Sequence, residues 1–199
     1  MMHDPNLTLP EGIFISYRDP QESEGMAVSE LLKSITHAAP ALAHHPSGAP
    51  YLPKYPEQTI SISHSDHLVA IGLVAEREAH FGIDIEEKED QAARLLVRYS
   101  TAIERQLLKS FGLSPLLLWC AKEAAYKAYS KQITRFSSQL TLTNATSEAV
   151  SIHIQPSEGP ETSILVRYHQ LPNGALLTYT TPHSTPLPIR WISQDEPLI

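Results

Sequence analysis

The stretch "WCAKEAAYKAYS", residues 119–130, has the pattern that decides this fold. Residues three and four apart stack over one another on a helix, so the large polar side chains of this stretch share one broad face. That face contains Trp119, Lys122, Glu123, Tyr126 and Lys127, and the opposite face contains Leu117, Ala121, Ala124, Ala125 and Ala128. The face of small side chains predicts close packing against a neighbouring element. The face of large polar side chains is expected to point towards a group that the helix binds.

Length and composition predict one globular domain or two small fused ones, because the chain has 199 residues, of which 42% are hydrophobic and 19% charged. The formal net charge of −7 argues against nucleic-acid binding, which requires clustered Lys and Arg. Cys120 is the only cysteine, so no intramolecular disulfide can form, and we expect it to be a small buried hydrophobe. The longest apolar stretch, residues 68–75, is too short to span a bilayer. We expect a soluble cytoplasmic protein without a membrane partner.

The order of the patterns predicts an α+β fold. Strand patterns occupy residues 13–17, 59–63, 67–76 and 80–86, helical patterns occupy 24–36 and 88–109, and a proline-rich connector fills 38–56. Gly112 predicts a helix stop, and Ser114 before Pro115 predicts the start of the next helix. Strand patterns near Leu140, Val150, Leu165 and Leu177 predict an antiparallel meander, followed by a proline-rich tail. We expect two similar α+β halves related by a pseudo-twofold, residues 1–80 and 81–199, joined near residues 79–81.

An acidic strand carries the first candidate site residues. In "FGIDIEEKED", residues 81–90, Asp84 and Glu86 are two apart, so both carboxylates project from one face of the strand. Paired carboxylate oxygens suit a hard cation such as Mg²⁺, although charged strand ends are mostly solvated. Glu123 offers a third carboxylate with Lys127 one turn further on. A surface ion pair would explain these two residues but not the rest of their helix face.

A second segment, "SISHS" at residues 61–65, follows the proline-rich connector. A single histidine is usually a structural hydrogen-bonding group. His64, however, is flanked by Ser63 and Ser65, and this segment offers donors suited to an anionic phosphate oxygen.

Together these segments resemble the 4'-phosphopantetheinyl transferase superfamily, whose members carry three such motifs in this order. The motifs are Ser63-His64-Ser65, Gly82-Ile83-Asp84-Ile85-Glu86 and Trp119-x-x-Lys122-Glu123-x-x-x-Lys127. The resemblance covers residues 48–130, and the length is similar to that of the monomeric, pseudo-duplicated, surfactin-synthetase-activating-like subtype. It implies a holo-[acyl-carrier-protein] synthase type of enzyme. Such an enzyme moves the 4'-phosphopantetheine arm of coenzyme A to a serine of an apo acyl or peptidyl carrier protein and releases adenosine 3',5'-bisphosphate.

The resemblance also implies a role for each matching residue. Asp84, Glu86 and Glu123 would hold Mg²⁺, and Glu123 would act as the general base. Lys127 would neutralise charge on the bridging and leaving oxygens, with Lys122 as an accessory phosphate contact. Ser63 and His64 would contact the phosphates of coenzyme A from the 1–80 half, while the 81–199 half supplies the metal site and the catalytic helix. The catalytic set would thus be Glu123, Lys127 and His64, and Trp119 is expected to pack the helix in place.

The sequence departs from the family at the nucleotide-binding positions. Gly48-Ala49-Pro50 stands where members usually have Gly-Lys-Pro, and Lys33 is the only Lys or Arg in residues 19–53. The possible substitutes are Lys54, His44 and His45. Two alternatives therefore stay open, a catalytically degenerate member that binds a carrier protein or a nucleotide, and an unrelated Mg²⁺-dependent phosphohydrolase. Arg94, Arg98, Arg105 and Lys109 are candidates for docking an acidic carrier, or else they form a solvated helix surface among interleaved acids.

Overall fold

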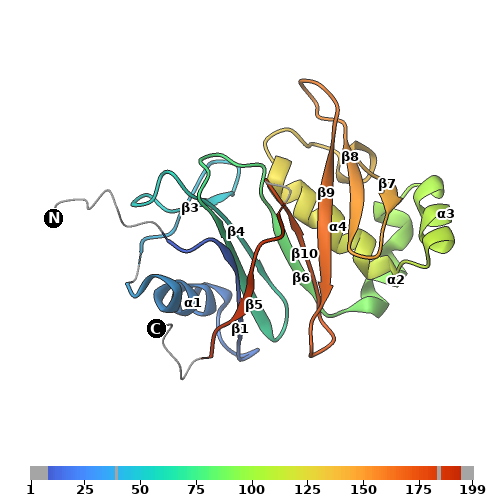
Figure 1. The fold of residues 1–199 in the computed structure, drawn as a ribbon. Helices are drawn as coiled ribbons and strands as arrows, with labels where there is room; N and C mark the ends of the chain where they lie inside the picture. Colours follow the sequence, from blue (N-terminus) through green and yellow to red (C-terminus); the bar gives the residue numbers. More distant parts are fainter. Residues whose placement is uncertain (1–8, 39, 183–184, 194–199) are drawn as a thin grey trace.

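The computed structural model describes residues 9–38, 40–182 and 185–193, and its fold is α+β as predicted (Figure 1). Its helices are α1 (Glu24–Thr36), α2 (Glu89–Tyr99), α3 (Ala102–Phe111), α4 (Pro115–Tyr129) and α5 (Phe136–Gln139). Its strands are β1 (Gly12–Tyr17), β2 (Ala43–His44), β3 (Pro50–Tyr51), β4 (Thr59–His64), β5 (Leu68–Val74), β6 (Ile83–Glu86), β7 (Leu140–Ala145), β8 (Ala149–Ile154), β9 (Thr162–Gln170), β10 (Leu176–Thr180) and β11 (Ile189–Trp191).

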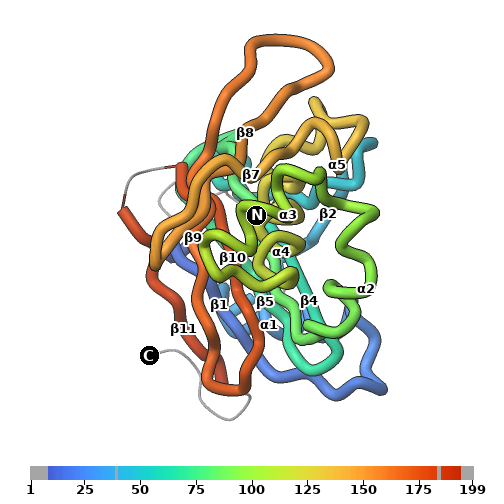
Figure 2. Tube along the Cα trace, turned by 90° about the vertical axis from the view of Figure 1, so that its right-hand side faces the viewer, coloured from blue at the N-terminus to red at the C-terminus, as the bar shows by residue number. Residues whose placement is uncertain are grey.

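Two sheets form the centre of the molecule, with helices on their outer sides. The first has the strand order β11-β1-β5-β4 and the second has the order β6-β10-β9-β8-β7. Helix α1 packs on the first sheet and α4 on the second, where α2 also contacts α4 (Figure 1). Figure 2 shows the same arrangement from the side of α2, α3 and α4. The layers therefore follow one another as helix, sheet, sheet and helix.

Strand β5, "LVAIGLV", is apolar throughout because both of its faces are buried. Leu68, Ala70 and Val74 face the second sheet, whereas Val69 and Ile71 face α1. On the other side of the inter-sheet core, Ile83 and Ile85 of β6 pack together with Leu177 and Tyr179 of β10. Because side chains alternate along a strand, the residues between these apolar positions of β6 point towards α4.

Two strand assignments differ from the sequence prediction. The connector predicted to be irregular contains β2 and β3, a two-stranded antiparallel pair of two residues each. The proline-rich tail contains β11, which runs parallel to β1 and pairs Ile13 with Ile189. These strands are too short to give a periodic signal. The pseudo-twofold and the division at residue 80 stay predictions, and β11 returns to the first sheet from beyond that division.

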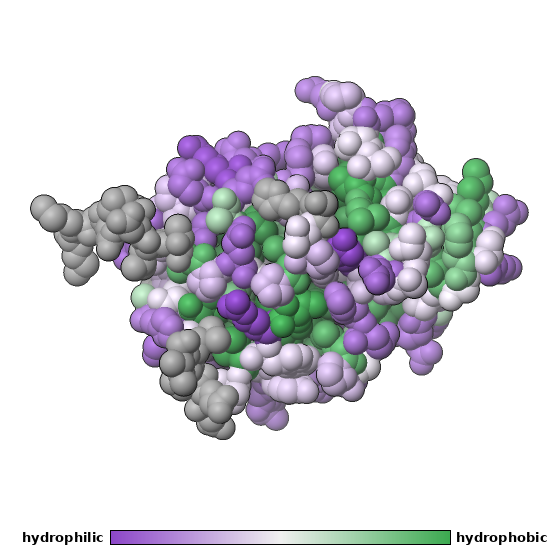
Figure 3. Space-filling model, in the orientation of Figure 1, coloured by the Kyte–Doolittle hydropathy of each residue, from purple (hydrophilic) through white to green (hydrophobic). Residues whose placement is uncertain are grey.

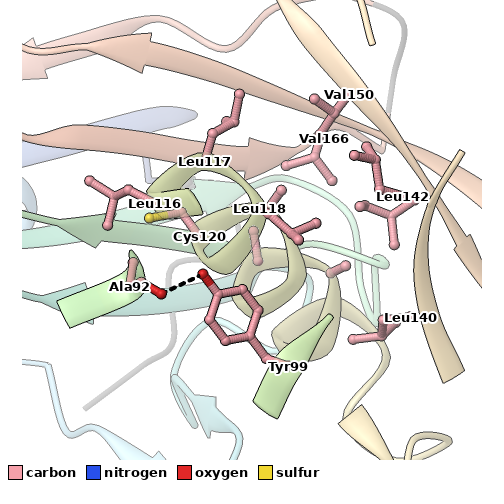
Figure 4. Packing of buried hydrophobic residues seen from close by; sticks show 14 of the residues in the cluster. Ala92, Tyr99, Leu116, Leu117, Leu118, Cys120, Leu140, Leu142, Val150 and Val166 are labelled. Atoms are coloured by element: carbon pink, nitrogen blue, oxygen red, sulfur yellow. Dashed lines mark hydrogen bonds between the residues drawn. The ribbon is translucent and has the colours of Figure 1, made fainter. Parts of the chain in front are cut away.

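Helix α4 begins and packs as the sequence predicted. The Ser114 side chain accepts a hydrogen bond from the Leu117 N–H, and Pro115 occupies the first turn. Ala121, Ala124 and Ala125 are fully buried (Figure 4 shows the surrounding apolar cluster). A Cβ atom added at Gly82 would lie 2.0 Å from the Ala124 carbonyl oxygen, so this glycine is required where β6 meets the helix.

The predicted helical stretch before α4 is divided into two helices. Ser100 ends α2 and Thr101 begins α3 in a capping box, in which the Thr101 and Glu104 side chains bond to each other's backbone N–H groups. Gly112 ends α3 with a φ of 64°, as its predicted role requires. None of the helices in the described parts of the chain has the length and the apolar character needed to cross a membrane.

Candidate functional site

Asp84 lies at the centre of a polar cluster where β4, β6 and α4 meet. It is 4% exposed, and its Oδ1 accepts hydrogen bonds from the Ser63 hydroxyl and the Lys127 ammonium, each at 2.8 Å. It points towards α4 because Ile83 and Ile85 on either side face the inter-sheet core. The structure therefore brings together three of the predicted site residues, from three elements that are distant in sequence.

Lys127 connects all three elements of this cluster. Its ammonium donates to the Ser63 hydroxyl at 3.0 Å, to the Ile83 carbonyl at 2.9 Å and to Asp84 at 2.8 Å. These three bonds use every donor of a lysine ammonium. The side chain is nevertheless 28% exposed, so an incoming anion has access to it. A cation that binds Oδ1 of Asp84 would compete with Lys127 for that oxygen.

Alternate serines of β4 satisfy the free edge of β6. The Ser61 hydroxyl oxygen accepts a hydrogen bond from the Ile83 N–H at 3.0 Å, and the Ser63 oxygen accepts one from the Ile85 N–H at 3.2 Å. Residues two apart on a strand share a face, so the Ser-x-Ser spacing matches the spacing of these N–H groups. The Ser61-x-Ser63 pattern could have indicated that these hydroxyl groups pair with the backbone of a neighbouring strand. The contact of Ser63 with a phosphate stays a prediction.

Glu86 and Glu123 complete the acidic group around Asp84. Burial is the main cause that raises the pKa of Glu86, and the charge of Asp84 adds to it, while a hydrogen bond from Trp119 acts in the opposite direction. Burial likewise raises the pKa of Glu123 to about 7, with the charges of Asp84 and Glu86 adding to it and that of Lys127 opposing it. The charge of Asp84 thus acts on both glutamates, and that of Glu86 acts on Glu123.

These carboxyl groups do not form a ready-made metal site. Across the described ranges, no three His, Cys, Asp or Glu side chains are arranged to hold a metal ion together. In addition, Lys127 forms an ion pair with Asp84 Oδ1 at 2.8 Å. However, the second oxygen, Oδ2, is buried without a hydrogen-bond partner among the described residues. An unpaired carboxylate oxygen in a buried acidic cluster is a donor that suits a divalent cation.

His64 follows Ser63 at the end of β4 and points out of the cluster. Its Nε2 lies 2.9 Å from a carboxylate oxygen of Glu24, at the start of α1, and the two side chains are 39% and 58% exposed. The geometry therefore leaves His64 accessible to a ligand that displaces Glu24. The structure does not bring it into contact with the carboxyl groups of the cluster.

Lys122 is the predicted site residue that the structure separates from the others. Its side chain is 0% exposed, and its ammonium forms an ion pair with Glu104 at 2.8 Å and donates to the Tyr99 carbonyl at 2.8 Å. A lysine held in this way cannot reach a phosphate without breaking a buried ion pair. The expectation that Lys122 shares the polar face of α4 is wrong, because the helix is covered on that side by α2 and α3.

The neighbours of Lys122 on the helix are held by packing. The Trp119 ring contacts those of Tyr99 and Phe136, with centroids 5.1 and 5.6 Å apart, which agrees with its expected packing role. Cys120 is fully buried, as predicted. Burial raises the pKa of its thiol well above the usual value, and the charges of Asp84 and Glu86 add to this effect, so it stays a neutral thiol.

The substitutes for the missing lysine lie near the β2–β3 pair. His44, His45 and Lys54 are all exposed. The His45 ring stacks on Tyr51 with centroids 4.4 Å apart, and its backbone N–H donates to the Ala49 carbonyl at 2.9 Å. These groups are available to an anion, but no contact joins them to the Asp84 cluster in the described structure.

The molecule also has a cavity of about 710 Å³ that is separate from the cluster residues. It is lined by the β6–α2 loop, the first turn of α4 and the end of β9, including Glu87, Leu116 and His169. Asp84, Glu86 and Glu123 are not among its lining residues. The acidic cluster is therefore a partly exposed junction rather than the floor of this cavity.

A family model for the 4'-phosphopantetheinyl transferase superfamily matches residues 80–180, just over half of the chain. The match begins directly before β6 and extends through α4 to the end of β10, so it includes Asp84, Glu86, Glu123 and Lys127. The chain belongs to this superfamily. No curated protein matches the sequence.

Proposed function

We propose that the protein transfers the 4'-phosphopantetheine arm of coenzyme A to a serine of an apo acyl or peptidyl carrier protein, as a holo-[acyl-carrier-protein] synthase type of enzyme. One observation carries this proposal. The charges of Asp84 and Glu86 help to raise the pKa of Glu123, and the partly exposed ammonium of Lys127 lies beside Asp84, all within the segment that the superfamily model matches. The two similar halves, the monomeric state and the cytoplasmic location belong to the same proposal.

Mg²⁺ fits the donor set of this cluster. Asp84, Glu86 and Glu123 would hold it, since Asp84 Oδ2 is buried without a hydrogen-bond partner among the described residues. Burial is the main cause that raises the pKa of Glu123, and the charges of Asp84 and Glu86 add to it. When bound, Mg²⁺ supplies charge neutralisation for a pyrophosphate. If the ion also takes Oδ1 of Asp84, Lys127 gives up its bond to that oxygen, which frees an ammonium donor for a phosphate oxygen.

The residues of the cluster then divide the reaction between them. The serine oxygen of the carrier forms a bond to the β-phosphorus of coenzyme A, and the bond from that phosphorus to adenosine 3',5'-bisphosphate breaks. Glu123 accepts the proton of the serine hydroxyl, a task suited to a carboxylate with a pKa of about 7. Lys127 stabilises the negative charge that develops on the leaving oxygen. Ser63 and His64 contact the phosphates from the β4 side.

Incubation of the purified protein with coenzyme A, Mg²⁺ and several apo carrier proteins tests this proposal. Mass spectrometry of the intact carrier should show the gain of one phosphopantetheine arm with wild-type protein and with Glu30→Gln, a matched change on the exposed side of α1. Glu123→Gln should show no gain. Cleavage of coenzyme A without modification of any carrier would indicate a phosphohydrolase instead.

The proposal requires a surface that binds the carrier, and α2 with α3 offers one. Glu104 is the only acid in residues 91–112, and it is buried against Lys122. Beyond the first turn of α2, where Glu89 and Asp90 are exposed, the charged side chains exposed on the two helices are therefore cationic, and apolar ones lie among them, namely Arg94, Val97, Arg98, Ile103, Lys109 and Phe111. Figure 3 shows the apolar part of this surface over α3, flanked by hydrophilic groups. In a chain with a net charge of −7, this local excess of positive charge is complementary to an acidic carrier.

Charge reversal on this surface gives a direct test. Arg94→Glu with Arg98→Glu should raise the KM for the carrier at least about tenfold and leave the KM for coenzyme A unchanged, with an effect that decreases as salt is added. Arg77→Glu, in the exposed turn after β5, makes the same type of charge change elsewhere and should alter neither constant. Equal carrier KM values for all these variants would place the docking surface elsewhere.

A second candidate function is supported by two observations. Lys127 already occupies Asp84 Oδ1, and Ala49 stands where family members have a lysine that helps to hold coenzyme A. Both would suit a catalytically degenerate member that binds a carrier protein or a nucleotide. Such a protein would bind an apo carrier or coenzyme A in calorimetry but would leave the mass of every carrier unchanged.

A further inference from the structure

The side of α4 opposite the Asp84 cluster contains a fully buried ion pair. The side chains of Lys122 and Glu104 are 0% and 1% exposed. The Lys122 ammonium lies 2.8 Å from Glu104 Oε1 and 3.1 Å from Oε2, and it also donates to the Tyr99 carbonyl at 2.8 Å. No group of the proposed reaction uses these atoms, and no solvent reaches them.

The Glu104 carboxylate connects four elements of the second half. Oε1 accepts the Leu142 N–H of β7 at 2.9 Å, and Oε2 accepts the Thr101 N–H at 2.8 Å, at the start of α3. Lys122 adds α4, and through the Tyr99 carbonyl it adds the end of α2. Each donor and acceptor of the pair thus has a partner fixed in direction.

The back of α4 does little to fix the rotation of this helix about its axis. Ala121, Ala124 and Ala125 form a smooth buried surface. Small side chains allow close approach but interlock weakly with their neighbours, so this alanine stretch leaves rotation to be resisted by larger buried side chains such as Leu118 and Tyr129 and by directional bonds. A buried ion pair commonly adds little net stability over apolar residues of the same size, but its directional bonds specify one arrangement.

Glu123 follows Lys122 in the sequence, so any rotation of the helix moves both residues. A rotation of about 20° displaces a carboxylate about 6 Å from the helix axis by about 2 Å. A displacement of this size is enough to reduce catalysis strongly, because reacting groups must be held within about 1 Å.

We propose that the Lys122–Glu104 pair is a positioning element that fixes the rotation of α4 and so holds Glu123 beside Asp84 and Glu86. This inference rests on the proposed transferase function. It assigns Lys122 to positioning rather than to phosphate binding. It also gives Glu104, which precedes the Trp119 motif on the neighbouring helix α3, a function that the sequence did not reveal.

The double variant Lys122→Met with Glu104→Gln tests the inference, because it removes both charges together and keeps similar side-chain volumes. We expect a folded protein whose kcat is lower by at least about tenfold, whose KM for coenzyme A is unchanged, and whose affinity for Mn²⁺, measured by electron paramagnetic resonance, is at least about tenfold weaker. Lys122→Arg, which keeps the charge but changes its geometry, should retain the fold and lose part of kcat.

Each other outcome has a distinct meaning. A wild-type kcat and Mn²⁺ affinity in the folded double variant would overturn the inference. A raised KM for coenzyme A in the double variant, with kcat unchanged, would also overturn it and restore Lys122 as a phosphate contact. If the double variant does not fold, Lys122→Arg decides by the same two measurements. Absence of transfer by the wild-type protein would instead refute the proposed function, and the Mn²⁺ measurement would still test the positioning.

Discussion

Lys122 and Lys127 lie on the same helix, five residues apart, yet their surroundings are opposite. Lys122 is fully buried, and its ammonium is held by Glu104 and the Tyr99 carbonyl, whereas Lys127 is 28% exposed and bridges Ser63, Ile83 and Asp84. Burial is the main cause that lowers the pKa of Lys122, and its bond to Glu104 opposes this effect. The comparison indicates that α4 has a fixed side, where Lys122 is buried in an ion pair, and an exchangeable side, where Lys127 and the carboxyl groups can change partners when a ligand binds.

The largest expected effect comes from removing a carboxylate on the exchangeable side. Asp84→Asn and Glu123→Gln should each reduce kcat for transfer at least about 100-fold, since each removes a charge that the proposed reaction requires at its centre. Thermal unfolding should show that both variants remain folded. Transfer at the wild-type rate by either variant would contradict the proposed site.

The two lysines themselves should respond in different ways. Lys122→Met leaves Glu104 as an unpaired buried charge, so we expect it to lower the free energy of unfolding by about 3–5 kcal/mol and the Tm by about 10 °C. Lys127→Met should reduce kcat at least about tenfold with a smaller loss of Tm, because part of its side chain is exposed. Calorimetry and transfer rates measured on both variants test this difference. Equal losses of Tm in the two variants would contradict it.

Gly82 sets the distance between β6, which has Asp84 and Glu86, and α4, which has Glu123. In Gly82→Ala the added Cβ would lie 2.0 Å from the Ala124 carbonyl oxygen, so strand and helix must separate. We expect a loss of about 1–3 kcal/mol in the free energy of unfolding, together with weaker Mn²⁺ binding. Gly25→Ala, in the first turn of α1 where the added Cβ meets nothing within 4 Å, is the matched control. It should leave Mn²⁺ binding unchanged and should not lower the free energy of unfolding, because alanine favours a helix more than glycine does.

The pH dependence of stability should report the acidic cluster. The folded state raises the pKa of Glu123 from 4.5 to about 7, so it binds a proton more tightly than the unfolded chain does. Its contribution is therefore most favourable below pH 4.5 and is lost as the pH rises to 7 and above, at a cost of about 1–3 kcal/mol by pH 8. Without metal, Glu123→Gln should have a higher Tm than the wild type at pH 8 but not at pH 5. Equal differences at both pH values would show that Glu123 titrates normally.

The smallest effect concerns the serines that join β4 to β6. Ser61→Ala leaves the Ile83 N–H without its acceptor and should cost about 1–2 kcal/mol, or a few degrees in Tm. Ser29→Ala, on the exposed side of α1, should have almost no effect. A loss in Ser61→Ala no larger than in this control would mean that water replaces the hydroxyl at the junction.

Much of the architecture could be predicted from local patterns. The alternation in β1, β4 and β6 and the start of α4 at Ser114 agree with the structure because each depends on neighbouring residues. Strand β11 could not be predicted, because a three-residue strand is stabilised by its pairing with β1 rather than by its own sequence. The same limit applies to the division of residues 88–109, where a capping box interrupts an otherwise continuous helical pattern.

The site shows the same division between local and tertiary information. The sequence indicated that Asp84 and Glu86 share a face of one strand and that α4 has a small back, and the structure agrees on both. It could not indicate that Lys122 turns towards Glu104, because a helix wheel does not show which neighbour covers which face. The Thr101-x-x-Glu104 capping pattern was the one available signal, and it gave no sign that the same carboxylate also binds a lysine of α4.

The central claim is that three carboxylates from β6 and α4 share one divalent ion. Mn²⁺ binding measured by electron paramagnetic resonance tests it most directly, in the wild type, Asp84→Asn, Glu86→Gln, Glu123→Gln and the control Glu30→Gln. We predict one bound ion per chain in the wild type and the control, and affinities at least about tenfold weaker in the other three. Equal affinity in all five proteins, or no binding by the wild type, would contradict the account.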